Sequence, residues 1–251
     1  MNPFHTSVDL FRDRADAGRR LAALVTDLRR ADVVVLGLPR GGVPVALEVA
    51  RTLGAPLDVV VAHKLGAPLQ PELAMGAVGE GGVVVVDERT VRACRVTPDE
   101  LAAAEAAEEQ EVVRRATRFR AGREPVPLAG RTAVVVDDGV ATGATARAAC
   151  LAARARGAGR VVLAVPVCAA DSAAALRQVC DSVRCVLRPR HLRSVGEWYE
   201  QFPQVSDDEV LAVLRAARHG GRDVRAADEA PGGQEAGAQG ASPGAGPHAE
   251  V

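Results

Sequence analysis

Five short runs of valine and other apolar residues, separated by segments with helical spacing, constrain this chain most. Runs of this length predict strands, and their continuous apolar character is typical of strands buried on both faces of a sheet. Parallel strands need crossover connections, which are usually helices. We therefore expect an α/β fold with a mostly parallel, twisted sheet flanked by helices. The runs span 33–36, 57–62, 83–86, 132–136 and 161–165.

The segments between the runs predict the flanking helices. Apolar residues recur at i, i+3, i+4 and i+7 from Leu21 to Leu28, and a similar pattern follows Gly42. Thr97 begins a capping box with proline at the first helical position, and a polar, alanine- and glutamate-rich stretch follows it. This stretch predicts a mobile helical insertion over 98–121. A second capping box at Ser206 predicts a final helix with a purely structural role.

Composition limits the classes of function. The 251 residues include 31 basic and 32 acidic side chains, so no global field favours nucleic acid or a membrane surface. No apolar run is long enough to span a bilayer, and the first residues lack a signal-peptide core, which makes the cytoplasm the expected location. Five cysteines without a CxxC pair indicate neither a disulfide framework nor a structural zinc site. We expect one domain over 1–219 and a disordered glycine- and alanine-rich tail over 220–251.

One buried run ends in two acids, Asp137 and Asp138, and continues through a turn of small residues into an alanine-rich helix. Strand ends in parallel sheets open onto the crevice where ligands bind, and a helix N-terminus attracts phosphate. Gly143 permits close approach of the backbone, and Thr142 and Thr145 add hydroxyl donors. Because carboxylates repel phosphate, the acids should face ribose hydroxyls and a hydrated cation. The alternative is an ordinary strand, turn and helix whose acids cap the helix.

The order of apolar run, two acids, three variable residues, Thr, Gly, any residue and Thr resembles the signature of the type I phosphoribosyltransferases. The match is complete. The resemblance implies a Rossmann-like three-layer fold with a small hood, often assembled as a homodimer. It also implies that Asp137 and Asp138 act in catalysis by holding the ribose hydroxyls of 5-phosphoribosyl-1-pyrophosphate (PRPP), directly or through magnesium. The 5-phosphate would lie against Ala141, Thr142, Gly143, Ala144 and Thr145.

A second glycine-rich turn follows the first run and could form a nest of backbone N–H groups for another anion. In the family this loop receives the pyrophosphate, often through an unusual cis peptide. The resemblance therefore implies a pyrophosphate site, although a plain turn stays possible. Lys64, directly after the second run, is expected to reach the pyrophosphate and act in catalysis, with simple solvent exposure as the alternative. The loop residues are Pro39, Arg40, Gly41 and Gly42.

The stretch 68–82 has glycines where a hinge would need them, and it resembles the flexible catalytic loop of this fold. Such a loop would close over the site and exclude water during catalysis. Glu72 and Glu80 are candidate base-contacting or proton-handling groups, with surface charge as the alternative reading. The loop and the helical insertion together occupy 66–122 of a core that spans 31–187.

The acceptor should bind under a hood formed by about 8–20 and 188–205. The second of these segments contains the only tryptophan and the only tyrosine of the chain. An aromatic side chain could stack on a base, but packing against the sheet edge explains it equally well. The candidate hood residues are Arg190, Val195, Trp198 and Tyr199.

Two classes of function stay open at this point. The first is transfer of the phosphoribosyl group to a nitrogen acceptor, such as a nucleobase, with release of pyrophosphate. Enzymes that salvage 6-oxopurines commonly carry an acid where this chain has Ala141, which argues against simple hypoxanthine–guanine salvage. The second is a non-catalytic PRPP sensor, although Lys64 and a glycine-hinged loop favour the enzyme. A DNA-binding repressor is not expected, because the sequence has no basic stripe or recognition module.

Overall fold

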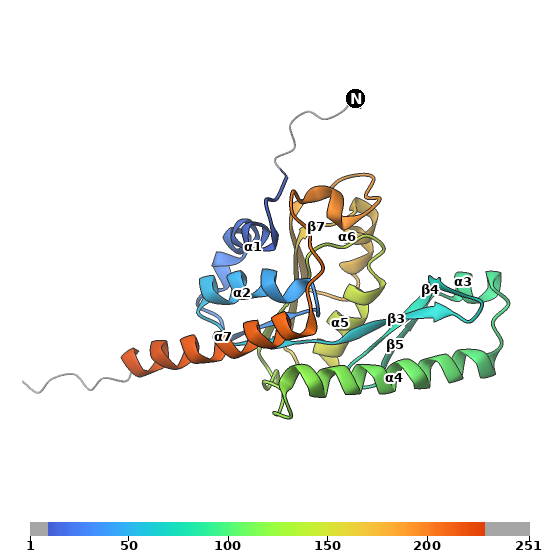
Figure 1. The fold of residues 1–251 in the computed structure, drawn as a ribbon, viewed down its shortest axis with the longest axis horizontal. Coiled ribbons are helices and arrows are strands. Elements are labelled where there is room, and N and C mark those ends of the chain that lie inside the picture. The colour runs from blue at the N-terminus through green and yellow to red at the C-terminus, as the bar shows by residue number, and fades with distance from the viewer. Residues whose placement is uncertain (1–9, 229–251) are drawn as a thin grey trace, which may run out of the picture.

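The computed structural model describes residues 10–228 and is organised around a five-stranded sheet in the order β2-β1-β6-β7-β8. All four neighbouring pairs of this sheet are parallel, with Gly37 beside Val136 at the ends of the two central strands. This arrangement confirms the predicted α/β fold (Figure 1). The strands are β1 (Val33–Gly37), β2 (Leu57–Val59), β6 (Thr132–Val136), β7 (Arg160–Val167) and β8 (Ser182–Leu187).

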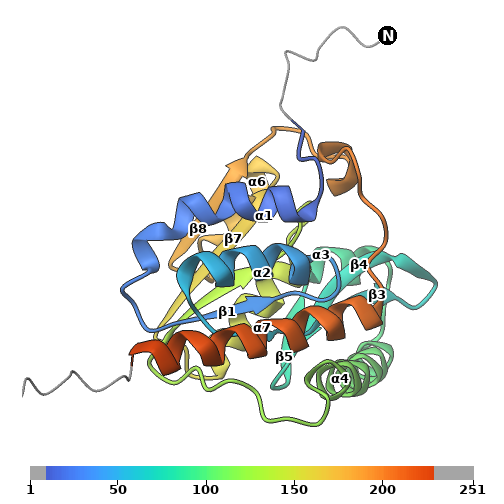
Figure 2. The ribbon, with the colours of Figure 1, turned by 60° about the vertical axis from the view of Figure 1, so that its left-hand side comes forward.

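Helices cover both faces of the sheet because side chains of a buried strand alternate between them. In β1, Val33 and Val35 pack in one apolar cluster, and Val34 and Leu36 pack in another. Figure 2 shows α1, α2 and α7 in front of the sheet, and α5 lies behind it. The helices are α1 (Arg14–Ala22), α2 (Gly42–Leu53), α5 (Ala144–Ala155), α6 (Ala170–Leu176) and α7 (Asp207–Asp228), with short 3-10 turns η1 (Ala23–Leu28) and η2 (Val195–Trp198).

A separate three-stranded antiparallel sheet forms an arm beside the main sheet (Figure 1). It consists of β3 (Ala62–Ala67), β4 (Gln70–Gly79) and β5 (Val83–Val86), followed by the short helix α3 (Glu88–Ala93). The predicted strand 57–62 is therefore wrong as one unit, because the chain leaves the main sheet after Val59 and enters the arm at Ala62.

The arm also corrects two further predictions. The run 83–86 is a strand, but it pairs antiparallel with β4 alone and leaves Val84 39% exposed. Most of the stretch 68–82, predicted as a flexible loop, is the strand β4. Its backbone pairs with a strand on each side, and Met75 and Val78 are fully buried. Pairing on both sides gives this segment the hydrogen bonds that a free loop lacks.

Helix α4 (Pro98–Arg120) lies along the arm and agrees with the predicted insertion over 98–121. Its capping box is formed, since the Glu100 carboxylate accepts from the Thr97 backbone N–H at 2.8 Å. The helix buries Val112 and Phe119 against the arm and core. Its mobility stays a prediction.

The last described element, α7, continues to Asp228, so the predicted start of the tail at residue 220 falls inside a helix. Alanine and arginine after Gly221 have high helix propensity, which accounts for the extension. The rest of the predicted tail, 229–251, lies outside the described residues, as do the first nine residues. Within 10–228, none of the helices combines the length and the apolar character needed to cross a bilayer.

Candidate functional site

The two central strands end side by side, and this brings the acid pair against the glycine-rich loop. The Leu38 N–H donates to the Val136 carbonyl at 2.8 Å. A Cβ atom added to Gly41 would lie 1.9 Å from Asp138 Oδ2. Only glycine allows the loop backbone to approach the acid this closely. The peptide bond between Pro39 and Arg40 is cis, as the family resemblance led us to expect.

Asp137 and Asp138 form a buried pair of like charges. Burial raises the pKa of Asp137 well above its usual range, and the charge of Asp138 raises it further. Burial also raises the pKa of Asp138, although the Arg14 guanidinium opposes this change. The Asp138 backbone N–H donates to Asp137 Oδ1 at 2.9 Å. A cation beside these carboxylates would relieve both the burial cost and the repulsion.

Arg14 is the basic partner of this pair, and its side chain is 11% exposed. Its Nε donates to Asp138 Oδ2 at 2.9 Å, and another guanidinium nitrogen donates to the Pro203 carbonyl at 2.7 Å. The guanidinium also stacks 3.8 Å from the centre of the Phe202 ring. The sequence analysis placed Arg14 in the hood segment without assigning it a partner. Its position at the first turn of α1, where the helix dipole disfavours a cation, was the available signal.

The predicted 5-phosphate loop connects Asp138 to the N-terminus of α5. Gly143 precedes the helix with a φ of +84°, a left-handed conformation that favours glycine. The Ser172 hydroxyl donates to the Ala141 carbonyl and fixes the loop to α6. Thr142 is exposed, and Thr145 is partly exposed. The open helix end and these hydroxyls form a suitable place for a phosphate group.

The two predicted hood segments lie together. The Phe11 N–H donates to the Trp198 carbonyl at 2.9 Å, and the residue after Tyr199 donates back to the Phe11 carbonyl. Tyr199 is 6% exposed, and its hydroxyl donates to the Asp138 carbonyl at 2.6 Å. The Tyr199 ring therefore connects the hood to the acid pair rather than offering a stacking surface.

The other hood candidates differ in exposure. Val195 approaches the acid pair, since a Cβ added to Gly139 would lie 2.4 Å from Val195 Cγ1. Trp198 is half-buried and packs in the apolar cluster around Phe11. Arg190 is exposed. Among these candidates, Arg190 and Trp198 are the ones whose side chains retain accessible surface for an acceptor.

Lys64 and Glu72 lie on the arm. Lys64 is in β3 opposite Ala77, and Glu72 is in β4. The sequence placed Lys64 just beyond a strand of the main sheet. This placement is corrected, because the chain has already crossed into the arm at that point. The neighbouring His63 Nδ1 contacts the Glu108 carboxylate of α4.

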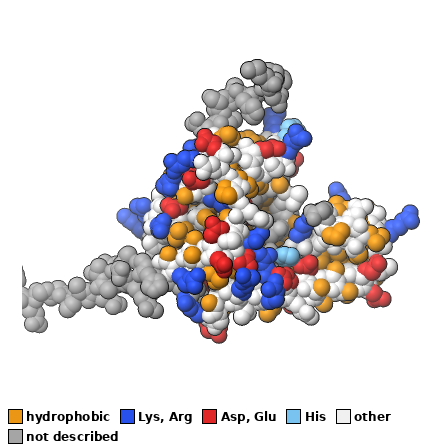
Figure 3. Space-filling model, in the orientation of Figure 1, with side chains coloured by type: hydrophobic (Ala, Val, Ile, Leu, Met, Phe, Trp, Pro, Cys, Tyr) orange, Lys and Arg blue, Asp and Glu red, His pale blue; other side chains and the backbone are white. Residues whose placement is uncertain are grey.

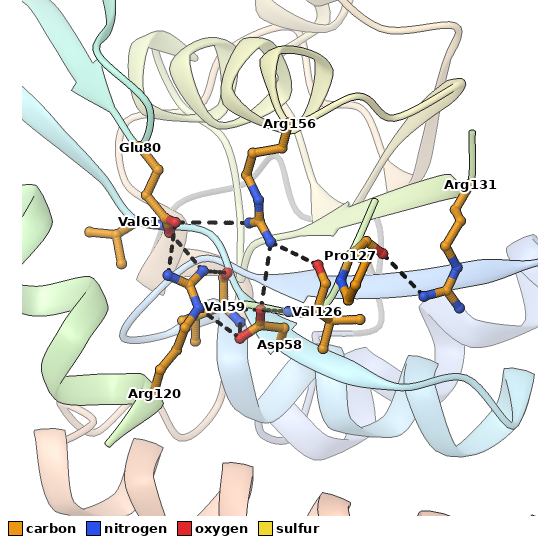
Figure 4. A network of polar contacts seen from close by, with 9 residues as sticks. All are labelled: Asp58, Val59, Val61, Glu80, Arg120, Val126, Pro127, Arg131 and Arg156. Carbon is orange, nitrogen blue, oxygen red and sulfur yellow. Dashed lines mark hydrogen bonds and ion pairs between the residues drawn. The ribbon is translucent and has the colours of Figure 1, made fainter. Parts of the chain in front are cut away.

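Glu80 belongs to a buried network of two acids and two arginines (Figure 4). Its carboxylate accepts from the Val61 N–H at 2.7 Å and pairs with Arg120 at 2.9 Å and Arg156 at 3.9 Å. Asp58, 2% exposed, pairs with the same arginines at 3.2 and 3.7 Å. This placement corrects the predicted role of Glu80 in contacting a base, because both carboxylate oxygens are used in the network. The isolated acid within the apolar run 57–62 was the missed signal.

A hollow of about 350 Å³ opens beside the acid pair. It presents two guanidinium groups, a carboxylate and an aromatic ring, which suits a polar or anionic ligand. Within the described residues, no three histidine, cysteine or acidic side chains lie close enough together to hold a metal ion. A cation at the acid pair would therefore need oxygens from its ligand. The hollow is lined by Arg14, Arg40, Gly41, Asp138, Phe202, Gln204 and Val205.

Comparison with known proteins identifies similar chains. Residues 9–206 match the family model of the phosphoribosyl transferase domain. Two curated relatives from Mycobacterium tuberculosis, of strains CDC 1551 / Oshkosh and H37Rv, are each named "Putative phosphoribosyl transferase" and are 52% identical over 221 residues. The match covers 88% of this chain and 50% of each relative, so the chain spans about half their length. The crystal structure of TT1426 from Thermus thermophilus is 43% identical with a TM-score of 0.70, covering 82% of this chain and 97% of that one.

Proposed function

The chain belongs to the phosphoribosyl transferase family, and from this premise we propose that it transfers the phosphoribosyl group of PRPP to a nitrogen acceptor. Pyrophosphate is the leaving group, magnesium is the cofactor and a nucleobase is the proposed class of acceptor. The observation that carries this proposal is the meeting of three features at one edge of the sheet. These are the acid pair, the glycine-rich loop and the open N-terminus of α5.

Each feature would hold one part of PRPP. The N–H groups and hydroxyls of 141–145, with the positive end of the α5 dipole, would bind the 5-phosphate. Asp137 and Asp138 would accept hydrogen bonds from the ribose hydroxyls. The loop 39–42 would bind the pyrophosphate through its N–H groups and Arg40. These three contacts fix the sugar with its C1 atom between the leaving group and the hollow.

Catalysis would then depend on position and charge. The bond from C1 to pyrophosphate lengthens, positive charge develops on the ribose, and the acceptor nitrogen attacks from the opposite face. The nearby carboxylates stabilise the developing positive charge, and Arg40 stabilises the negative charge of the departing pyrophosphate. The Arg14 and Tyr199 contacts keep Asp138 in place during this step.

The acid pair fits a magnesium ion that takes most of its ligands from substrate and water. One oxygen of each carboxylate is hydrogen-bonded within the protein, and Asp137 Oδ2 and Asp138 Oδ1 remain to face a cation or hydroxyl. When bound, magnesium would neutralise charge on the leaving pyrophosphate. The raised pKa values of both acids support this assignment, because a cation would favour their ionised forms.

The proposal is tested by measuring pyrophosphate release from PRPP and magnesium across a panel of nucleobases. The double variant Asp137→Asn and Asp138→Asn should abolish release, and the exposed Asp208→Asn should leave it unchanged. Calorimetry with PRPP accompanies the assay. Acceptor-dependent release that needs the acid pair supports a transferase, and absence of both binding and release refutes the proposal.

A PRPP sensor is the second candidate, and one observation favours it. Glu80 is bound in a buried network, and the expected flexible loop is a paired strand, so two features that favoured catalysis are missing from the site. Tight, magnesium-dependent PRPP binding without turnover on any acceptor would support the sensor. We also propose a homodimer, by analogy with the family, which light scattering would test.

A further inference from the structure

Three arginines from separate segments converge on one carboxylate, that of Asp207 at the start of α7. Arg118 of α4 forms the close pair, with its nitrogen 2.7 Å from Asp207 Oδ2. Arg115 of the same helix and Arg40 of the glycine-rich loop lie 4.0 and 3.8 Å from Oδ1. The helix predicted to be purely structural therefore begins with a residue that contacts the proposed pyrophosphate loop.

The charges of this cluster do not balance. Three guanidinium groups surround one carboxylate, which leaves an excess of two positive charges among them. Asp207 Oδ1 is buried and makes no hydrogen bond, because both of its arginine neighbours stand beyond hydrogen-bonding distance. The nearby Glu209 carboxylate does not correct the imbalance, since it accepts from the Ser206 N–H and hydroxyl in the capping box. An anion with more oxygens than one carboxylate would satisfy these arginines better.

The cluster adjoins the hollow beside the acid pair. Arg40 lines that hollow, and so do Gln204 and Val205, which precede Asp207 by three and two residues. Figure 1 shows the C-terminal end of α4 meeting the N-terminal end of α7 below the main sheet. In Figure 3, basic and acidic side chains gather where the main body joins the arm. The cluster is thus placed at the edge of the site on the side of the loop 39–42.

We propose that Arg115 and Arg118 form, together with Arg40, a subsite for a diphosphate group, and that Asp207 competes with this ligand for the same arginines. The assignment of the diphosphate to the leaving group of PRPP rests on the proposed function. In the empty site Asp207 keeps the three arginines together. When the diphosphate enters, its oxygens replace the distant contacts of Arg40 and Arg115, and the insertion helix α4 gains a direct role in substrate binding.

The competition predicts opposite effects for two kinds of variant. The double variant Arg115→Ala and Arg118→Ala removes donors, so inorganic pyrophosphate and PRPP should each bind at least about tenfold more weakly. Asp207→Asn removes the competing charge and should strengthen pyrophosphate binding several-fold. Ribose 5-phosphate, which lacks the diphosphate, should bind all variants equally.

Calorimetry on the full chain with magnesium tests these effects. Arg114→Ala is the matched control on α4, because Arg114 pairs with Glu111 and does not contact Asp207. Asp208→Asn is the control on α7, because it changes the same helix end by the same charge. Both controls should bind pyrophosphate like the unaltered protein. Circular dichroism of each variant confirms that it is folded.

The outcomes separate this inference from the proposed function. Unchanged pyrophosphate binding in the Arg115 and Arg118 variant, or weaker binding in Asp207→Asn, overturns the subsite. Absence of pyrophosphate binding to the unaltered protein, or simultaneous binding of pyrophosphate and PRPP, also overturns it. Pyrophosphate binding with the predicted signs but no PRPP binding would retain the diphosphate subsite and refute the proposed function.

Discussion

Replacement of Arg120 with methionine should strongly destabilise the protein, because this side chain neutralises two buried acids. Arg120 is 7% exposed and lies 3.2 Å from Asp58 and 2.9 Å from Glu80. It also donates to the Val59 carbonyl at 2.7 Å. Burial alone would lower the pKa of Arg120, but the two acids outweigh it and the pKa is raised. The guanidinium is therefore fully charged in the folded protein.

The expected loss can be worked from the contacts that remain. Methionine has a similar length and keeps the apolar packing, so the change isolates the charge. Asp58 would keep two backbone N–H donors and the more distant Arg156, whereas Glu80 would keep one N–H donor and Arg156 at 3.9 Å. Removing one member of a buried ion pair typically costs about 3–5 kcal/mol, and we expect a value in this range.

Urea denaturation followed by circular dichroism measures this cost. Arg114→Met is the control, because its ion pair on the same helix is exposed, and its midpoint should not change. Adding Asp58→Asn to Arg120→Met should restore part of the loss, since the neutral amide leaves one less buried charge uncompensated. A loss below about 1 kcal/mol in Arg120→Met would refute the reasoning and show that apolar contacts alone attach α4 to the core.

Three further predictions concern the acid pair. Gly41→Ala should weaken PRPP binding about tenfold or more, because its Cβ would lie 1.9 Å from Asp138 Oδ2; unchanged affinity by calorimetry would contradict this. Tyr199→Phe should cost about 1 kcal/mol in urea denaturation, because the Asp138 carbonyl loses its donor; equal stability would show that the bond is dispensable. Asp137→Asn should raise the denaturation midpoint of the ligand-free protein more at pH 8 than at pH 5. The raised pKa of Asp137 means that its contribution to stability is present at low pH and lost as pH rises, so a smaller gain at pH 8 would be inconsistent with the burial of this acid.

The sequence predicted the main sheet because its central strands carry their own signal. In β1, β6 and β7 nearly every side chain is buried, and a continuous apolar run follows directly from this environment. The helices between them were visible through their apolar spacing. These features are local, so a reading of neighbouring residues was sufficient.

The arm could not be read in the same way. Strand β4 contains glycines and a proline, and β3 contains charged residues, so neither resembles a buried run. Their strand structure depends on pairing with each other, with register shifts after Leu65 and Gly66, and not on residue type. Glycine at position 76 illustrates the difference. It indicated a hinge in the sequence, but in the structure it allows close approach of β5, since a Cβ there would lie 2.1 Å from the Val85 carbonyl oxygen.

The proposed site shows the same division between local and distant information. The acids, the glycine-rich loop and the small-residue turn occupy short continuous segments, which the sequence revealed. Arg14 pairs with Asp138 across 124 positions, and Arg120 pairs with Asp58 across 62. Ion pairs at such separations leave no periodicity or motif. They become visible only when the fold brings their segments together.

The hood has consequences for how acceptor choice could vary in this fold. Asp138 is held by Arg14 through its side chain and by Tyr199 through its backbone, and both residues come from hood segments. A change at either one would disturb the proposed PRPP site together with any acceptor site. Exposed or half-buried positions such as Arg190 and Trp198 make no hydrogen bond to the acid pair. Variation at these outer positions could therefore alter the acceptor without displacing Asp138, whereas Arg14 and Tyr199 must be retained for the proposed PRPP site to keep its geometry.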